Sequence, residues 1–323
     1  MSNIVGWSVF SVMVVVMLAL DLGVFHRREH EVKMKEAIFW SVVWTLIALI
    51  FNAGVYFLKG KEMAMQFLAG YILERTLSFD NLFVFLLVFN YFQLPHRYHH
   101  KVLFWGIFGA LVFRAIFIGF GIGLLHYFSW MIYVFGAILV WTGVNLALEK
   151  DKKIEPEKNI FVKWFRKMFP VTTEYHEGKF FVRLKGVLYA TPLIVILLVI
   201  ESTDVVFAID SIPAILAISQ DVFIVYTSNV FAILGLRALY FAIAELMKMF
   251  HHLHYGLSLI LVLIGVKMLI AHFYHVPTVA ALGTILFVLA ASVVASIIWP
   301  QSLGEEKPVA KIPGSPQGPK VAG

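Results

Sequence analysis

The stretch ESTDVVFAID, residues 201–210, places three carboxylates inside the apolar run YATPLIVILLVIESTDVVFAIDSIPAILAI, residues 189–218. A run of this length and apolarity is typical of a helix that spans a bilayer. Each carboxylate near the bilayer centre costs about 2.5–3.5 kcal/mol on insertion scales. Glu201, Asp204 and Asp210 therefore need a compensating partner, and the identity of that partner bears directly on function.

The composition of the whole chain is that of a multi-pass membrane protein. Of its 323 residues, 60% are hydrophobic and 14% are charged, whereas a soluble domain is about half apolar and about a quarter charged. There is no cysteine, which excludes disulfides, thiolate metal sites and cysteine nucleophiles. No hydrolase elbow or zinc-protease motif is present, so we expect neither an enzyme nor a permanently bound cofactor.

The apolar runs predict an all-α membrane protein with about nine transmembrane helices. The first run lacks a basic leader and a small-residue cleavage site, so we interpret it as a helix rather than a signal peptide. The predicted spans are residues 4–25, 37–58, 64–92, 102–125, 127–148, 187–218, 222–247, 255–274 and 277–299.

The distribution of basic residues predicts the orientation. Most of the 26 Lys and Arg residues fall in one alternate set of loops and in the C-terminal tail, whereas Lys59 and Lys61 lie in the opposite set. The positive-inside rule then places the N-terminus outside and the C-terminus in the cytoplasm. Orientation explains the basic excess, so we expect no nucleic acid partner. The loop segment EKNIFVKWFRKMFPV, residues 157–171, is predicted to form an amphipathic helix.

A distant internal repeat relates two parts of the chain. LSFDNLFVF (77–85) aligns with ESTDVVFAI (201–209), so that Asp80 corresponds to Asp204. Continued downstream, this alignment pairs Arg114 with Arg237 and Gly143 with Gly265, with a slip of one residue at each step. Each unit contains three spans, an odd number, and the two units are therefore predicted to be inverted in the membrane. Many secondary transporters build a midplane site between such repeats.

This organisation predicts a transporter with inverted repeats, built from six segments; its LysE-like architecture is what the family resemblance described below implies. They are two N-terminal helices (1–60), the first repeat (61–148), a basic cytoplasmic loop (149–186), the second repeat (187–275), a last helix (276–300) and a disordered cytoplasmic tail (301–323).

Two interpretations explain the buried acids. In the first, they only form internal salt bridges with Arg75, Arg114, Arg237 and Lys267. In the second, they form a cation site of oxygen ligands, the kind that suits Mg²⁺, Ca²⁺ and Mn²⁺. On straight helices, Asp80 and Asp210 would point away from the other acids. We expect, however, that Pro213 breaks its helix beside Asp210 and frees the carbonyl of Ile209.

The second interpretation identifies specific candidates. The predicted metal ligands are Glu74, Asp80, Glu201, Asp204 and Asp210. The predicted supporting groups are the polar residues Ser78, Asn81, Ser202 and Thr203 and the charged residues Asp21, Arg114, Arg237 and Lys267.

Three motifs resemble those of the TerC/Alx family of bacterial inner-membrane proteins. They are LDLGVFHR (20–27), ERTLSFDNLFVF (74–85) and ESTDVVFAIDSIPAI (201–215), and the likeness covers about residues 5–300. That family is named for tellurite resistance, has been described as a redox modulator, includes members implicated in Mn²⁺ export, and is grouped with LysE-type exporters. The resemblance implies that function depends on the five acids above. A chain without cysteine cannot carry out direct thiol redox chemistry.

Together these observations predict a transporter that moves Mn²⁺, with Ca²⁺ or other divalent ions as further substrates, out of the cytoplasm. The ion is expected to bind between Asp80 and the pair Glu201 and Asp204, with proton exchange through the same acids as the energy source. Arg114 and Arg237 are expected to be counter-charges that hold the empty site together. The alternatives are a membrane scaffold that aids metal loading or insertion of exported proteins, and another stress- or redox-linked role without transport.

Overall fold

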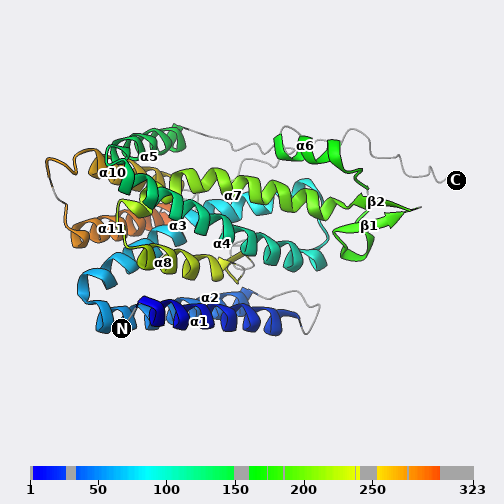
Figure 1. Ribbon diagram of the computed structural model, residues 1–323, viewed down its shortest axis with the longest axis horizontal. Helices are drawn as coiled ribbons and strands as arrows, with labels where there is room; N and C mark the ends of the chain where they lie inside the picture. Colours follow the sequence, from blue (N-terminus) through cyan, green and yellow to red (C-terminus); the bar gives the residue numbers. More distant parts are fainter. Residues whose placement is uncertain are drawn as a thin grey trace.

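The computed structural model describes residues 3–26, 34–148, 160–172, 174–184, 186–236, 238–240, 253–274 and 276–298. Within these ranges the molecule is a bundle of long helices that run roughly along its longest axis, with a small hairpin projecting at one end (Figure 1). The helices are α1 (Asn3–His26), α2 (Met34–Lys59), α3 (Lys61–Tyr91), α4 (His96–Tyr127), α5 (Met131–Leu148), α6 (Ile160–Met168), α7 (Pro192–Leu216), α8 (Val222–Leu234), α10 (Leu253–Leu269) and α11 (Thr278–Ile298).

The described helices confirm an all-α membrane protein. Five of them are long and apolar enough to cross a bilayer, over residues 35–59, 96–127, 131–148, 192–216 and 278–296. Shorter apolar helices cover Gly6–Ala19, Val222–Leu234 and Tyr255–Leu269. Helix α3 has the length of a span but carries Glu74 and Arg75 near its middle. The count of nine spans stays a prediction, because residues 241–252 lie outside the described ranges.

Two expectations about the sixth span were wrong. Residues 187–190 belong to a β-strand, so helix α7 begins at Pro192, where a proline fits the first turn because its missing N–H has no partner there anyway. Pro213 does not break the helix, which continues to Leu216. Pro213 lies in the last turn, where the lost hydrogen bond affects only the end of the helix.

The loop before α7 contains more structure than the sequence indicated. The amphipathic helix expected over residues 157–171 is present as α6. An antiparallel hairpin follows, formed by β1 (Phe181–Leu184) and β2 (Val187–Ala190), with Gly186 at φ +84° in its turn. The hydroxyl of Tyr175 donates a 2.6 Å hydrogen bond to the carbonyl of Phe92, tying this segment to the end of α3. Burial raises the pKa of Tyr175 to about 12, which keeps that donor protonated.

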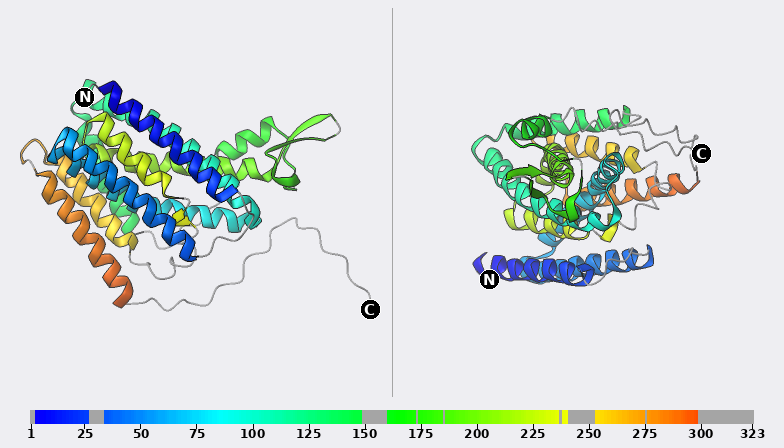
Figure 2. Two further views of the ribbon diagram at one scale, coloured as in Figure 1. Left: turned by 90° about the horizontal axis from the view of Figure 1, so that it is seen from below. Right: turned by 90° about the vertical axis from the view of Figure 1, so that its right-hand side faces the viewer.

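The helices pack in a definite arrangement around a central group. Helix α3 packs against α7 and α8, and helix α4 packs against α7 and α8 from another side. Helices α1 and α2 lie together on one flank and contact α8, and α2 also contacts α3 (Figure 2). An aromatic cluster that includes Phe51, Phe67 and Phe231 fills the space between this flank and the centre. The centre is thus formed by α3, α4, α7 and α8.

Helices α5 and α10 make the most extensive helix contact of the described structure, and glycines lie in it. A Cβ atom on Gly143 would lie 2.7 Å from Val262 and 2.8 Å from the carbonyl oxygen of Ser258. A Cβ atom on Gly265 would lie 2.7 Å from the carbonyl oxygen of Gly136 and 2.8 Å from Val140. The Ser258 hydroxyl also donates a 2.6 Å hydrogen bond to the carbonyl of Gly143. Small residues allow such close backbone approach between helices in membranes.

Replacing Gly143 by leucine is expected to destabilise the protein by about 1–3 kcal/mol or more, because the new side chain would meet backbone atoms that cannot move aside. Thermal unfolding of the purified protein in detergent, followed by tryptophan fluorescence, measures this effect as a lower midpoint. Gly283→Leu in α11 is the matched control, because a Cβ there meets nothing within 4 Å. Equal midpoints for the two variants would contradict the packing described for α5 and α10.

Candidate functional site

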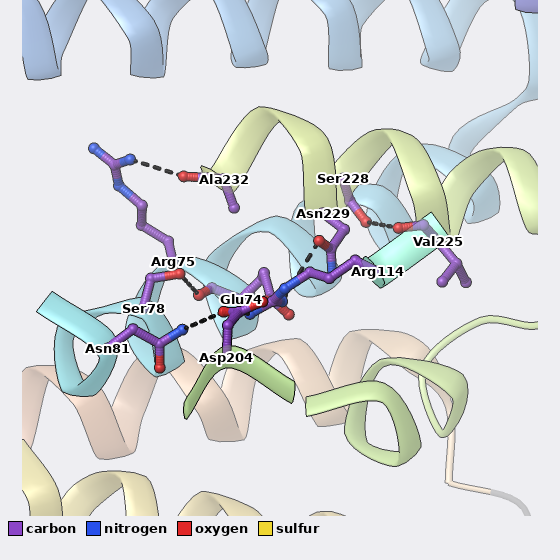
Figure 3. A network of polar contacts seen from close by, with 10 residues as sticks. All are labelled: Glu74, Arg75, Ser78, Asn81, Arg114, Asp204, Val225, Ser228, Asn229 and Ala232. Atoms are coloured by element: carbon purple, nitrogen blue, oxygen red, sulfur yellow. Dashed lines mark hydrogen bonds and ion pairs between the residues drawn. The ribbon is translucent and has the colours of Figure 1, made fainter. Parts of the chain in front are cut away.

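Arg114 on α4 lies at the centre of the most strongly charged part of the membrane-spanning bundle. Only 1% of this arginine is exposed. Its guanidinium forms an ion pair with Glu74 of α3 through Nη1, and Nη2 lies 3.4 Å from Oδ1 of Asp204 on α7 (Figure 3). The two acids belong to the two acidic motifs, residues 74–85 and 201–215. One buried cation therefore joins acids from two helices that are distant in sequence.

Two asparagines complete this network. Asn81 of α3 donates a 3.3 Å hydrogen bond from Nδ2 to Oδ1 of Asp204. Arg114 donates from Nη1 to Oδ1 of Asn229, a fully buried residue of α8, at 3.5 Å (Figure 3). Asn229 was not among the predicted residues, although the polar triplet Thr227, Ser228 and Asn229 in an apolar helix was a signal that could have identified it. Helices α3, α4, α7 and α8 all contribute to the network.

Several buried carboxylate oxygens of this region lack a hydrogen-bond donor among the side chains that the structure describes. Glu74 Oε2, Asp204 Oδ2 and Glu201 Oε2 are buried and accept no hydrogen bond from any described residue. A buried polar atom without a partner costs about 1–3 kcal/mol, and more when it is charged. Of the side chains that the structure describes, Arg114 is the one cation that pairs with Glu74 and Asp204. These two acids therefore share one positive charge.

Glu201 lies one helical turn before Asp204 and faces the same neighbour. Its carboxylate packs against Gly109 of α4, where a Cβ atom would collide with the carboxylate carbon and both oxygens. The i, i+3 spacing had predicted that Glu201 and Asp204 share a helix face, and both side chains do contact α4. Glycine at position 109 is what makes space for the Glu201 carboxylate.

The predicted hydroxyl ligands are bonded to their own helices. Ser78 donates a 2.7 Å hydrogen bond to the carbonyl of Glu74, and Thr203 donates at 2.7 Å to the carbonyl of Val199. Ser202 donates to the same Val199 carbonyl at 2.8 Å. Such bonds to the preceding turn are the usual way in which a hydroxyl satisfies itself inside a helix. Ser78 is fully buried beside Glu74 and belongs to the surroundings of the network.

A cavity of about 310 Å³ lies beside the network, between α3, α4, α5, α7 and α10. Asp210 lines this cavity and accepts a 2.8 Å hydrogen bond from the hydroxyl of Thr142 on α5. Its polar lining is formed by Asn81, Arg114, Thr142, Asn145, Asp210 and Ser211. The cavity thus connects Asp210 with two members of the Arg114 network. Thr142 and Asn145 were not predicted. They flank Gly143, the last landmark of the repeat, but neither is charged, and their position at this cavity depends on tertiary packing.

Two further cations, Arg75 and Lys267, bind backbone carbonyls. Arg75 donates to the carbonyl of Ala232 at 3.1 Å and to the Ser41 hydroxyl at 3.0 Å. Ala232 lies in the last turn of α8, which ends at Leu234, so Arg75 stabilises the negative end of that helix. Lys267 donates at 3.1 Å to the carbonyl of Ala217, which follows the last residue of α7. Arg75 and Lys267 thus stabilise helix ends.

Three predicted residues lie outside the described side chains. Asp21 is within α1 and Asp80 is within α3, but the structure places neither side chain, and Arg237 falls outside the described ranges. Among the described residues, no group of three or more His, Asp or Glu side chains comes together in the manner of a metal cluster. Glu74 and Asp204 meet at Arg114, Glu201 lies one turn away, and Asp210 faces the adjoining cavity.

Comparison with known proteins adds the family context. The model of the integral membrane protein TerC family matches residues 59–302. The membrane protein STKORF319 of Myxococcus xanthus, named as uncharacterized, is 47% identical over 292 residues, which cover 90% of this chain and 92% of that protein. A protein of Escherichia coli K12, named as a candidate membrane-bound redox modulator, Alx, is 44% identical over 292 residues, which cover 88% and 91%. No solved structure matches the chain significantly.

Proposed function

The chain belongs to the integral membrane protein TerC family, and from that premise we propose that it exports Mn²⁺ from the cytoplasm across a bacterial inner membrane. Ca²⁺ and other divalent ions are further candidate substrates. The cation binds among Glu74, Asp204 and Glu201, and the cavity that contains Asp210 is part of its path. The N-terminus lies outside and the C-terminus in the cytoplasm, as the basic loops indicate.

One observation carries this proposal: three buried carboxylate oxygens near Arg114 accept no hydrogen bond from any described residue. Acids kept in an apolar bundle with unused lone pairs are characteristic of ion and proton pathways in membranes. Carboxylate and amide oxygens are hard ligands that suit Mg²⁺, Ca²⁺ and Mn²⁺. A divalent cation would supply the positive charge that Glu74 and Asp204 lack while they share one guanidinium.

The helix contacts support inverted repeats as the framework of transport. In the predicted repeats, α3, α4 and α5 correspond in order to α7, α8 and α10. Two-fold symmetry then requires that a contact between α3 and α8 be matched by a contact between α7 and α4. Both contacts are present. The register that pairs Gly143 with Gly265 also pairs Val140 with Val262 and Gly136 with Ser258. Gly143 contacts Val262 and Ser258, whereas Gly265 contacts Val140 and Gly136, so the contacts are reciprocal. Rocking of two such halves gives alternating access.

Proton exchange is the energy source that this site supports. Release of a cation outside leaves carboxylates that bind protons, and the protons are carried inward when the site turns back. This scheme uses no covalent chemistry, so an enzyme activity is not part of the proposal. The relatives' description as redox modulators refers to those proteins; this chain has no cysteine thiol with which to carry out disulfide exchange.

The proposal is tested with the full chain in liposomes that contain a dye quenched by Mn²⁺. Saturable Mn²⁺ uptake is expected, with a proton countermovement reported by a pH dye in parallel liposomes. Ca²⁺ and Mg²⁺, added separately and as competitors, establish the order of preference. Absence of flux for every ion and pH gradient, from protein shown to be folded, would contradict transport and favour the scaffold role.

A further inference from the structure

A second cavity, of about 410 Å³, lies on the other side of the bundle, between α1, α2 and the start of α8. Its walls are apolar and include Trp7 of α1, Phe51 and Val55 of α2, and Phe223 of α8. None of these residues belongs to the Arg114 network. Away from its charged residues, a mainly apolar chamber between lipid-facing helices favours hydrocarbon over water, because such walls offer few hydrogen-bonding groups.

Two oppositely charged residues, Lys59 and Asp221, line this cavity. Lys59, the last residue of α2, lies with Nζ 3.2 Å from Oδ2 of Asp221, the residue before α8. Their side chains are 31% and 29% exposed, so both can be reached from outside. Lys59 Nζ also lies 4.9 Å from the ring centroid of Phe223 in the cavity wall. The cavity therefore presents one cation and one anion beside an apolar interior.

Two glycines leave the interior open. A Cβ atom on Gly54 would meet nothing within 4 Å, and one on Gly6 would first meet the ring of Phe223 at 3.7 Å. Aromatic side chains form part of the same cavity wall. The rings of Trp7 and Phe223 are in edge-to-face contact, with their centroids 5.2 Å apart. The space is thus bounded by large side chains and kept free by the absence of side chains at positions 6 and 54.

We propose that this cavity binds an acyl chain of a zwitterionic glycerophospholipid whose phosphate binds Lys59 and whose ammonium binds Asp221. The two charges of such a headgroup replace the two partners of the ion pair, so neither side chain is left uncompensated. An anionic headgroup would satisfy Lys59 but leave Asp221 beside a phosphate. A choline headgroup carries the cation but has no N–H to donate. Phosphatidylethanolamine is therefore the preferred lipid.

The experiment measures lipid retained by the purified full chain after exchange into an equal mixture of phosphatidylethanolamine, phosphatidylcholine and phosphatidylglycerol. Bound lipid is extracted and counted per chain by mass spectrometry. The native chain is expected to retain phosphatidylethanolamine in preference to the other two. Gly54→Leu is expected to lower that retention at least about tenfold, the effect of displacing about two methylene groups from an apolar site. Gly119→Leu, at another glycine with nothing within 4 Å, is the matched control and is expected to retain the lipid.

A second variant tests the headgroup. Asp221→Asn keeps an oxygen for the 3.0 Å hydrogen bond that the Asp221 side chain accepts from the Ile224 amide, so the start of α8 is preserved. Removal of the negative charge is expected to shift retention from phosphatidylethanolamine toward phosphatidylglycerol. The proposal is overturned if the native chain retains the three lipids equally or retains none, as when a second chain fills the cavity. Unchanged retention in Gly54→Leu overturns it as well.

Discussion

Asp204→Asn is expected to lower the Mn²⁺ flux of the reconstituted protein by between about tenfold and a hundredfold. This range corresponds to the loss of roughly 1.5–3 kcal/mol, the contribution of a hydrogen bond to a charged group. Asp204 contacts Arg114 and Asn81 and has one buried oxygen that accepts no hydrogen bond from the described residues. Asparagine has the same size and can still accept from Asn81. The substitution therefore removes the charge with little change in packing.

The measurement compares initial rates of Mn²⁺ uptake into liposomes at matched protein content. Glu177→Gln makes the same change of carboxylate to amide at an exposed position outside the bundle and is expected to keep the native rate. Asp204→Glu keeps the charge and is expected to retain more flux than Asp204→Asn. Native flux in Asp204→Asn would show that this carboxylate does not bind the transported ion and would weaken the proposed function.

Arg114→Met is expected to destabilise the protein by about 3–5 kcal/mol, because it leaves the carboxylates of Glu74 and Asp204 buried without their cation. The effect is measured as the midpoint of thermal unfolding in detergent, without divalent ions. Arg183→Met, at an exposed arginine of the hairpin, is the control and is expected to keep the native midpoint. If Arg114→Met matched the native midpoint, the ion pairs around Arg114 would contribute nothing to stability.

The effect of Mn²⁺ on the unfolding midpoint tests whether Arg114 is only structural or occupies a cation-binding position. In Arg114→Met a divalent cation can take the place of the guanidinium, so Mn²⁺ is expected to raise the unfolding midpoint more in this variant than in the native protein. The double variant Arg114→Met with Glu74→Gln removes one acid as well and is expected to recover part of the lost stability without Mn²⁺. An equal response to Mn²⁺ in the native chain and in Arg114→Met would indicate that the ion binds elsewhere.

Much of the fold could be predicted from the sequence because long apolar runs allow few structures in a bilayer. Every buried backbone group must be paired there, and a helix does this within a single segment. The hairpin was missed because its second strand, Val187–Ala190, is apolar and continues directly into the apolar run of α7. Hydropathy alone does not separate the two. The glycine at 186, with its positive φ, was the available local signal.

The site was predictable in part. The repeat singled out Asp204, paired with Asp80, and Arg114, paired with Arg237, and the structure brings Asp204 and Arg114 together with Glu74. Helix rotation and neighbouring packing decide which charges meet, and neither follows from spacing along one helix. Arg75 and Lys267 therefore bind carbonyls at helix ends, although their number had suggested partners for the acids. Tertiary packing of α8 and α5 places Asn229 against Arg114 and Asn145 at the cavity. Only Asn229 had a local signal, the polar triplet at 227–229.

The glycine contact between α5 and α10 has a consequence for permeability. Where Gly136 and Gly265 bring backbone against backbone, no space is left for a water molecule, an ion or a lipid chain. The contact between α5 and α10 is therefore impermeable. Main-chain atoms form the barrier, and unlike side chains they cannot change rotamer to open a path. In the proposed transport scheme the ion travels on the opposite side of α5, toward α7, where the Thr142 hydroxyl donates its hydrogen bond to Asp210 beside the cavity of the Arg114 network.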